Sequence, residues 1–302
     1  MRKFVTESIP PISTANTAIV SASGGDYSTL QAAVAAVASW CSGATATNRC
    51  VIRLMPGKYI VTTVVEIPEF MDVVGQGATN TVISRSTATT STTDGVLRMG
   101  NQTNLVGVTI KKTGTTSYST GIYLNAAIVK LDRIAIDVTG ATVTNYGVNV
   151  GNSAGSQVSI YDSDIKVHGI TARSRGVYFS LQSGPGLEIK RSTINAECAN
   201  CVSIYGVYSR SKSNFTDVTI EATDTAVGSI SDRGIYTLSA DTTTVDRCRI
   251  TSSGEGIRES STGDVRIFSS RISGALDNIF GTFSCYDTRD GATYAELDAS
   301  CN

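Results

Sequence analysis

The chain has 302 residues, only 17% of them are charged, and its formal net charge is −1. This balance gives no electrostatic footprint for nucleic acid or for an anionic membrane surface, and no apolar stretch approaches the length of a transmembrane helix. We therefore expect neither a nucleic-acid partner nor insertion into a membrane.

The N-terminus is expected to be a lead-in or attachment segment, residues 1–17, because Pro10 and Pro11 interrupt any regular element there. It starts with basic residues, but the apolar region of a signal peptide does not follow. The remainder, residues 18–302, is expected to form a single domain.

One amphipathic helix is expected near the start of this domain, over residues 28–40. Ser28 and Gln31 have the spacing of a capping box, and Leu30 and Val34 share an apolar face with other residues of the segment. A repeat structure exposes an apolar end that has to be covered. We interpret the helix as the cap of that end.

Short strands separated by turns follow, at residues 51–54, 60–65, 71–74 and 82–83. Residues 84–94 are almost wholly Ser and Thr and are expected to form a surface loop. Regular repeats then run over residues 95–281, approximately, and the tail 282–302 is expected to cap the last of them.

The repeat consists of a glycine, a β-branched residue and an outward residue, and a phrase ending in Ile follows each time. The glycines are Gly95, Gly121, Gly147, Gly176, Gly206, Gly234 and Gly256, and the isoleucines are Ile110, Ile136, Ile165, Ile194, Ile220, Ile250 and Ile272. The steps between successive glycines are 26, 26, 29, 30, 28 and 22 residues. The glycine phrase and the isoleucine phrase each resemble a strand and recur together at this period. Such a pattern predicts an array in which each repeat is one coil of a parallel β-solenoid.

The second residue after each glycine should point outward, because strand side chains alternate between the two faces. These residues are Leu97, Tyr123, Asn149, Tyr178, Tyr208, Tyr236 and Arg258. Stacked coils would align four of these tyrosines on one outer face. Either the ladder reflects only the preference of Tyr for strands, or it is a binding surface.

The seven cysteines contain two pairs near the ends of the array, Cys41 with Cys50 and Cys285 with Cys301, which we interpret as candidate disulfides. Cys198 and Cys201 form either a loop disulfide or two free thiols. Since His168 is the only histidine, a zinc site is hard to build, and we expect no metal and no cofactor. The end pairs favour an oxidising compartment.

Two segments resemble the pectinesterases (pectin methylesterases) and the wider pectin-lyase-like β-helix proteins. The first runs from Gly24-Gly25-Asp26-Tyr27 through Pro56-Gly57-Lys58-Tyr59 to Val74-Gly75-Gln76-Gly77. It is similar to the opening of the pectinesterase fold, so the resemblance implies an all-β, single-stranded, right-handed parallel β-helix with an N-terminal amphipathic capping helix.

The second segment, Gly274-Ala275-Leu276-Asp277-Asn278-Ile279-Phe280-Gly281, is similar to the family motif that carries the nucleophilic Asp. Asp277 takes the position of that nucleophile. The preceding coil lacks the family's acid/base Asp, and Glu255 is the nearest substitute. Arg258 is a candidate donor to an oxyanion. Carboxylate-driven ester hydrolysis requires all three roles, so the catalytic set is incomplete.

Three functions remain open. The first is a polysaccharide-directed β-helix, adhesin or phage tail-spike-like, that binds a polysaccharide or cell-surface glycan along Tyr123, Asn149, Tyr178, Tyr208 and Tyr236. The second is a carbohydrate esterase or glycanase that uses Asp277. The third is a purely structural solenoid of a virion or extracellular appendage. An extracellular or virion-associated location fits all three, and a homo-oligomer is a possible assembly.

Overall fold

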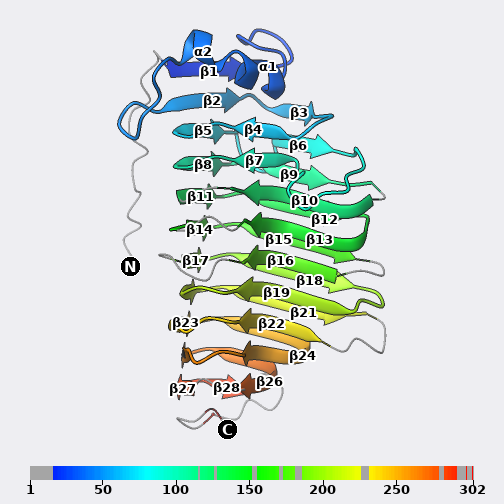
Figure 1. The fold of residues 1–302 in the computed structure, drawn as a ribbon, viewed down its shortest axis with the longest axis vertical. Coiled ribbons are helices and arrows are strands. Elements are labelled where there is room, and N and C mark those ends of the chain that lie inside the picture. The colour runs from blue at the N-terminus through cyan, green and yellow to red at the C-terminus, as the bar shows by residue number, and fades with distance from the viewer. Residues whose placement is uncertain are drawn as a thin grey trace.

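All strands of the computed structural model run parallel and wind into one elongated solenoid (Figure 1). The structure describes residues 16–114, 116–125, 128–151, 155–169, 173–180, 186–225, 231–278 and 282–290, together with Leu297 and Cys301. Within this part of the chain, no helix is both long enough and apolar enough to cross a bilayer.

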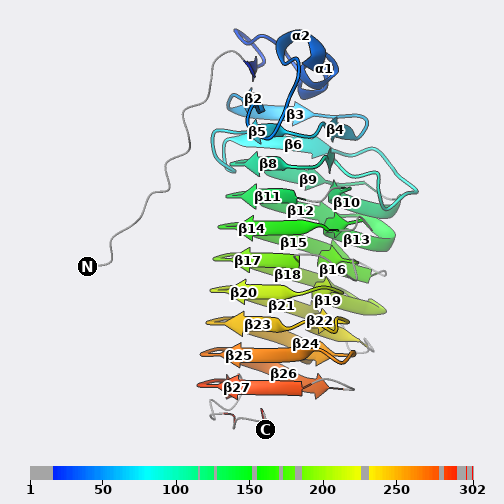
Figure 2. The same ribbon diagram turned by 60° about the vertical axis from the view of Figure 1, so that its left-hand side comes forward.

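Three rows of strands form the walls of the solenoid (Figure 2). The first row contains β1 (Thr17–Val20), β2 (Cys50–Leu54), β5 (Met71–Val74), β8 (Thr103–Val106), β11 (Ile128–Asp132), β14 (Gln157–Tyr161), β17 (Gly186–Lys190), β20 (Ser213–Thr216), β23 (Thr243–Asp246), β25 (Asp264–Phe268) and β27 (Thr282–Tyr286). The second contains β3 (Gly57–Ile60), β6 (Thr81–Arg85), β9 (Thr109–Lys112), β12 (Ala135–Thr139), β15 (Asp164–Gly169), β18 (Thr193–Cys198), β21 (Thr219–Asp224), β24 (Arg249–Glu259), β26 (Arg271–Asn278) and β28 (Arg289–Asp290). The third contains β4 (Val65–Ile67), β7 (Leu97–Met99), β10 (Thr116–Leu124), β13 (Ala141–Val150), β16 (Arg173–Phe179), β19 (Ser203–Ser209) and β22 (Asp232–Thr237), and it continues into the second halves of β24 and β26.

The two repeated phrases of the sequence meet inside the solenoid. A Cβ atom added to Gly206 would lie 2.3 Å from Cγ2 of Ile220 and 2.6 Å from the carbonyl oxygen of Gly234 on the next coil. Similar contacts recur at Gly121 with Ile136, Gly147 with Ile165, Gly176 with Ile194, Gly234 with Ile250, and Gly256 with Ile272. Glycine is therefore required where the second and third rows pack closely, which explains why the phrases keep pace.

The first repeat differs from the predicted register by one residue. Leu97 is fully buried and pairs with Ile122, whereas Arg98 pairs with Tyr123. Val96 is also buried, so two consecutive residues follow Gly95 into the core. The prediction that Leu97 points outward is wrong, because strict alternation does not hold at this point of the chain.

The predicted helix consists of two short helices, α1 (Leu30–Ala35) and α2 (Val37–Trp40). Thr29, not Ser28, is the N-cap, and its hydroxyl accepts a hydrogen bond of 3.1 Å from the N–H of Ala32. Figures 1 and 2 show the pair at the N-terminal end of the solenoid, where Leu30 and Ala33 join the core. The role of residues 28–40 as a cap stays a prediction.

Three disulfides are present in the described part of the chain: Cys41–Cys50, Cys198–Cys201 and Cys285–Cys301. Cys248 is buried with a free thiol, and desolvation raises its pKa to about 11. The Cys198–Cys201 pair packs with Ala196, Ile204 and Ala222 in a small cluster of its own.

Candidate functional site

An outward column of side chains runs along the third row of strands. Its members, in register on successive coils, are Arg98, Tyr123, Asn149, Tyr178, Tyr208, Tyr236, Arg258 and Asp277. The structure thus brings the predicted ligand-binding residues into one line and continues that line to Asp277. Arg98 occupies the position expected for Leu97.

A second column, which the sequence analysis missed, lies beside the first. It contains Thr120, Tyr146, Arg175, Tyr205, Arg233 and Glu255, again in register. Each member immediately precedes one of the repeated glycines, so a sequence signal exists. Perfect alternation would place residues three apart on opposite faces, but the chain irregularity at each glycine turns both outward. We call the two columns together the tyrosine–arginine face.

The tyrosine rings of this face stack on one another along the solenoid. The rings of Tyr178 and Tyr208 have centroids 4.7 Å apart with planes inclined by 28°, and Tyr236 meets Tyr208 edge-on at 5.3 Å. Tyr146 lies 5.5 Å from Tyr178. The spacing between neighbouring strands, about 4.8 Å, places such rings in contact.

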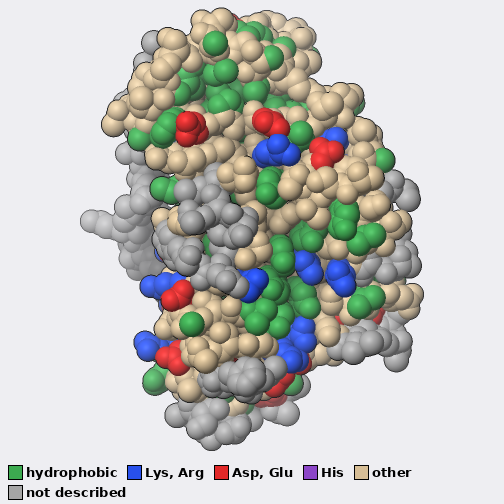
Figure 3. Space-filling view, in the orientation of Figure 1, with side chains coloured by type: hydrophobic (Ala, Val, Ile, Leu, Met, Phe, Trp, Pro, Cys, Tyr) green, Lys and Arg blue, Asp and Glu red, His purple; other side chains and the backbone are tan. Residues whose placement is uncertain are grey.

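Two guanidinium groups fill the spaces between the rings. The Arg175 guanidinium lies 4.3 Å from the centroid of Tyr178, and that of Arg233 lies 4.5 Å from the centroid of Tyr236. Since cations and neighbouring rings cover much of the aromatic faces, the surface offers ring edges, hydroxyls and guanidinium groups. Figure 3 shows hydrophobic side chains, which include Tyr, gathered over β16, β19 and β22 with Lys or Arg beside them.

Two phenols of this face, Tyr146 and Tyr208, have raised pKa values. Burial raises the pKa of Tyr208 to about 12, and Tyr178 adds to the effect. Burial also raises the pKa of Tyr146, against an opposing contribution from Arg175. The hydroxyls of Tyr146 and Tyr208 are therefore neutral groups that can both donate and accept hydrogen bonds.

The three candidate catalytic residues meet at the C-terminal end of the same face. Nη1 of Arg258 lies 2.7 Å from Oε1 of Glu255 and 3.2 Å from Oδ2 of Asp277. Nε of Arg233 lies 2.5 Å from Oε2 of Glu255. Arg258 thus separates the two carboxylates, and both oxygens of Glu255 are held by guanidinium groups.

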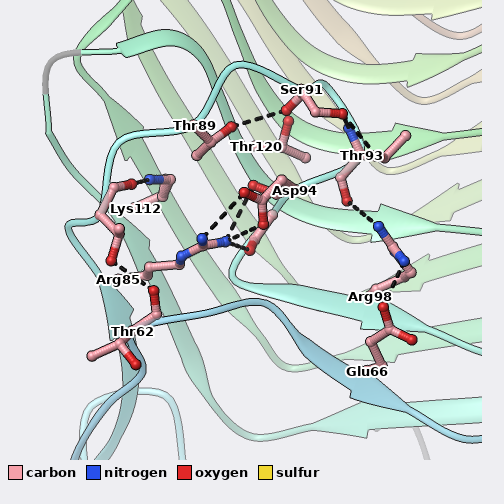
Figure 4. A network of polar contacts seen from close by, with 12 residues as sticks. Thr62, Glu66, Arg85, Thr89, Ser91, Thr93, Asp94, Arg98, Lys112 and Thr120 are labelled. Atoms are coloured by element: carbon pink, nitrogen blue, oxygen red, sulfur yellow. Dashed lines mark hydrogen bonds and ion pairs between the residues drawn. The ribbon is translucent and has the colours of Figure 1, made fainter.

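The Ser/Thr-rich loop, residues 86–94, covers the N-terminal end of the columns (Figure 4). The carbonyl oxygen of Thr92 accepts hydrogen bonds from the Thr120 hydroxyl, at 2.9 Å, and from Nδ2 of Asn149, at 3.1 Å. Asn149 is only 6% exposed as a result. The Asn149 amide therefore already donates to the loop, which covers this predicted ligand-binding residue.

Buried charges anchor this loop. Arg85 pairs with Asp94 and donates to the carbonyl oxygen of Gly95, and Nζ of Lys112 donates to the carbonyl oxygen of Thr87 (Figure 4). Lys112 is fully buried, and desolvation together with Arg85 lowers its pKa to about 8. The lysine occupies an inward position of β9, where alternation would place an apolar residue.

Within the described residues, no group of three or more His, Cys, Asp or Glu side chains is arranged to hold a metal ion. Two open cavities lie away from the tyrosine–arginine face, along the corner between the first and second rows of strands. The candidate site is therefore an open surface along the solenoid.

No protein-family model matches the chain, and no curated protein matches it. Solved structures do. Pectin methylesterase from carrot has a TM-score of 0.54 at 13% identity, with 95% of this chain and 86% of that chain covered. Pectin methylesterase PemA from Erwinia chrysanthemi has a TM-score of 0.53 at 10% identity, with 96% and 92% covered. At such identities the likeness establishes the fold alone, and that fold is the right-handed parallel β-helix expected from the sequence.

Proposed function

We propose that the tyrosine–arginine face binds a glycan chain and that the protein is a recognition module, adhesin-like or phage tail-spike-like. A long face that repeats once per coil suits a linear polymer with its own repeat. Tyr178, Tyr208 and Tyr236 supply an amphipathic strip of ring edges and hydroxyls. Sugars present alternating CH and OH groups that match such a strip.

The observation that carries this proposal is the position of Arg175. Its guanidinium lies among Tyr146, Tyr178, Tyr205 and Tyr208 and donates to the Tyr146 hydroxyl at 3.3 Å. Among the residues that the structure describes, no carboxylate pairs with it. A desolvated cation without a counter-ion is costly unless a ligand's oxygens complete its shell.

The test is retention on a glycan array. Wild type is compared with Tyr178→Ala combined with Tyr208→Ala, which removes the stacked pair at the centre of the face. A matched control, Phe268→Ala combined with Tyr286→Ala, removes another stacked ring pair, with centroids 4.9 Å apart, on the first row of strands. We expect loss of retention in the first variant and not in the control.

If both ring-pair variants are retained equally, the tyrosine ladder does not bind the glycan and reflects only the preference of Tyr for strands. Retention absent from wild type, with strong self-association in its place, would instead support a purely structural solenoid. Tyr178, Tyr208 and Phe268 are partly buried, so both variants should melt at a lower temperature than wild type, although Tyr286 itself is exposed. Only the control separates loss of packing from loss of recognition.

A hydrolytic function is the second candidate, because Asp277, Glu255 and Arg258 lie together on the same face. Asp277 is the more accessible carboxylate, with 39% of its side chain exposed, as a nucleophile requires. Glu255 has both oxygens engaged by arginines, so proton transfer would need Arg233 or Arg258 to move aside. Hydrolysis of methyl-ester and glycan substrates by wild type, lost in Asp277→Ala, would favour this function.

An extracellular or virion-associated location accompanies the proposal. Disulfides persist in oxidising compartments, and three of them are present in the described chain. Assembly into a homo-oligomer belongs to the same proposal, and sedimentation of the intact protein tests it.

A further inference from the structure

The corner between the first and second rows of strands carries a regular ladder of charges. The turn residues there adopt left-handed backbone conformations, with φ of 50° at Asp162, 48° at Arg191, 55° at Asp217 and 51° at Arg247. Arg191 donates two hydrogen bonds of 2.7 Å to Asp162. Arg247 likewise donates to Asp217 at 2.8 and 3.0 Å. Along this line each arginine therefore has an acidic neighbour on the adjacent coil.

The adjoining line breaks this rule near the C-terminal end. Arg249, Arg271 and Arg289 occupy equivalent positions on β24, β26 and β28 and are in register. Like charges directly opposite on neighbouring strands destabilise a sheet. Arg249 and Arg289 are exposed, and no acidic side chain in the described part of the chain pairs with either of them. Arg271, between them, is engaged by the protein, whereas Arg249 and Arg289 are left to solvent among the described residues. Exposed like charges that break such a local rule are typical of a functional surface.

These arginines line a cavity of about 490 Å³ at the corner. Arg247 joins them, and Asp217 and Asp287 are the acidic residues of its lining. Among the described residues the lining holds four arginines and two aspartates, and Asp246 pairs with Arg247 beside it, so the groove keeps a net positive charge although the whole chain carries −1. The attraction for an anion is therefore local to the groove.

We propose that this corner groove binds the acidic groups, carboxylate or sulfate, of an anionic polysaccharide. Successive arginines lie one strand spacing apart, about 4.8 Å, so Arg249 and Arg289 are separated by roughly 10 Å. A single small anion does not span that distance, whereas charges repeated along a polymer do. Asp217 and Asp287 provide acceptors for sugar hydroxyls.

Single-stranded nucleic acid fits the groove less well. Proteins that bind it combine a basic groove with aromatic side chains that stack on the bases. Among the described residues, the lining of this cavity contains Val218, Thr219, Cys248, Ser269 and Ser270 beside the charged side chains, and no aromatic ring. The groove also lies on a different part of the solenoid from the tyrosine–arginine face, so the two sites can be tested separately.

The experiment measures binding of fluorescent polyglucuronate and dextran sulfate fragments at low and high salt, with neutral dextran and a single-stranded oligonucleotide as comparisons. The variant is Arg249→Gln combined with Arg289→Gln. A control with the same change in net charge, Lys58→Gln combined with Arg266→Gln, removes exposed basic residues elsewhere. We expect the groove variant to lower the association constant about tenfold or more at low salt and to flatten its salt dependence, with the control near wild type.

The two polymers separate carboxylate from sulfate recognition. The melting temperature of the groove variant should equal or exceed that of wild type, because like-charge repulsion is relieved. The variant Tyr178→Ala with Tyr208→Ala should keep this binding, which distinguishes failure here from failure of the proposed function. Equal weakening in groove variant and control, a fall in melting temperature, or binding of the oligonucleotide alone would overturn the inference.

Discussion

Replacement of the buried Lys112 by Met should change how stability depends on pH. The lysine is fully buried, and its pKa falls from 10.5 to about 8 because burial and Arg85 disfavour the charged form. Above about pH 8 the folded protein loses this proton, whereas the unfolded chain keeps it until pH 10.5 is approached. The unfolded state then binds more protons, so the contribution of Lys112 to the free energy of unfolding rises with pH across this window.

The magnitude follows from the two pKa values, 10.5 and about 8. At about 1.4 kcal/mol for each pH unit between them, the change is on the order of 3 kcal/mol. Below pH 8 the buried charge lowers the stability of wild type, whereas Met leaves the Thr87 carbonyl without its donor, so the prediction concerns how the difference between the two proteins changes with pH. Wild type should gain on the variant by this amount as the pH approaches 10.5.

The assay is urea unfolding of both proteins at several pH values between 7 and 10.5, analysed as the difference between them. The two proteins are compared with each other because the Cys248 thiol, present in both, has the opposite effect. Its pKa is raised from 9.0 to about 11, so its contribution to the free energy of unfolding falls as the pH rises. Lys58→Met, an exposed lysine, is the control and should show no such trend. A wild-type advantage that does not change with pH would refute the reasoning.

Three further predictions concern the core, a disulfide and the chemistry. Gly206→Ala should lower the free energy of unfolding by about 3 kcal/mol, because the added Cβ would lie 2.3 Å from Ile220. The control Gly43→Ala is strained only by its φ of 71° and should lower it by about 1 kcal/mol. Similar losses for the two variants in denaturant unfolding would contradict the close packing at Gly206. Replacement of Cys41 and Cys50 by Ser should lower the free energy of unfolding by about 2–3 kcal/mol, because the unfolded chain is no longer constrained by this loop. A reductant should therefore lower the melting temperature of wild type by more than that of the variant, which lacks this disulfide. Asp277→Ala should leave glycan retention unchanged, with no ester or glycan turnover before or after the substitution; turnover in wild type alone would reverse the order of the two proposed functions.

The architecture was predictable because the same packing constraint, a glycine against an isoleucine, recurs on successive coils. The close approach of Gly206 to Ile220 admits no side chain, so glycine and isoleucine recur at matched intervals. The same register predicts that Tyr178 and Tyr208 lie on one line, and the structure pairs them on adjacent strands. Period and alternation were enough for these features.

The missed features depend on local departures from alternation. The chain irregularity at each repeated glycine turns Arg175 and Tyr205 outward, next to the tyrosines, and simple counting cannot anticipate it. The same failure put Leu97 on the surface and left Arg98 unnoticed. Lys112 is the opposite case: counting places it inside, and only the network with Arg85 and Asp94 explains how a charge is kept there.

The orientation of the aromatic rings was also beyond the sequence. Exposed ring faces would allow sugars to stack flat on them, but the strand spacing stacks Tyr178 on Tyr208, and Arg175 covers another face. A glycan would meet edges, hydroxyls and guanidinium groups. This changes the chemistry of the proposed recognition and not its place.

A crystal structure of the protein with an oligosaccharide selected from the glycan array tests the central claim most directly. The account predicts a glycan chain along β13, β16, β19 and β22, with oxygens within hydrogen-bonding distance of Arg175 and contacts to Tyr178 and Tyr208. A glycan bound elsewhere, on the first row of strands for example, with the tyrosine–arginine face unchanged, would contradict it.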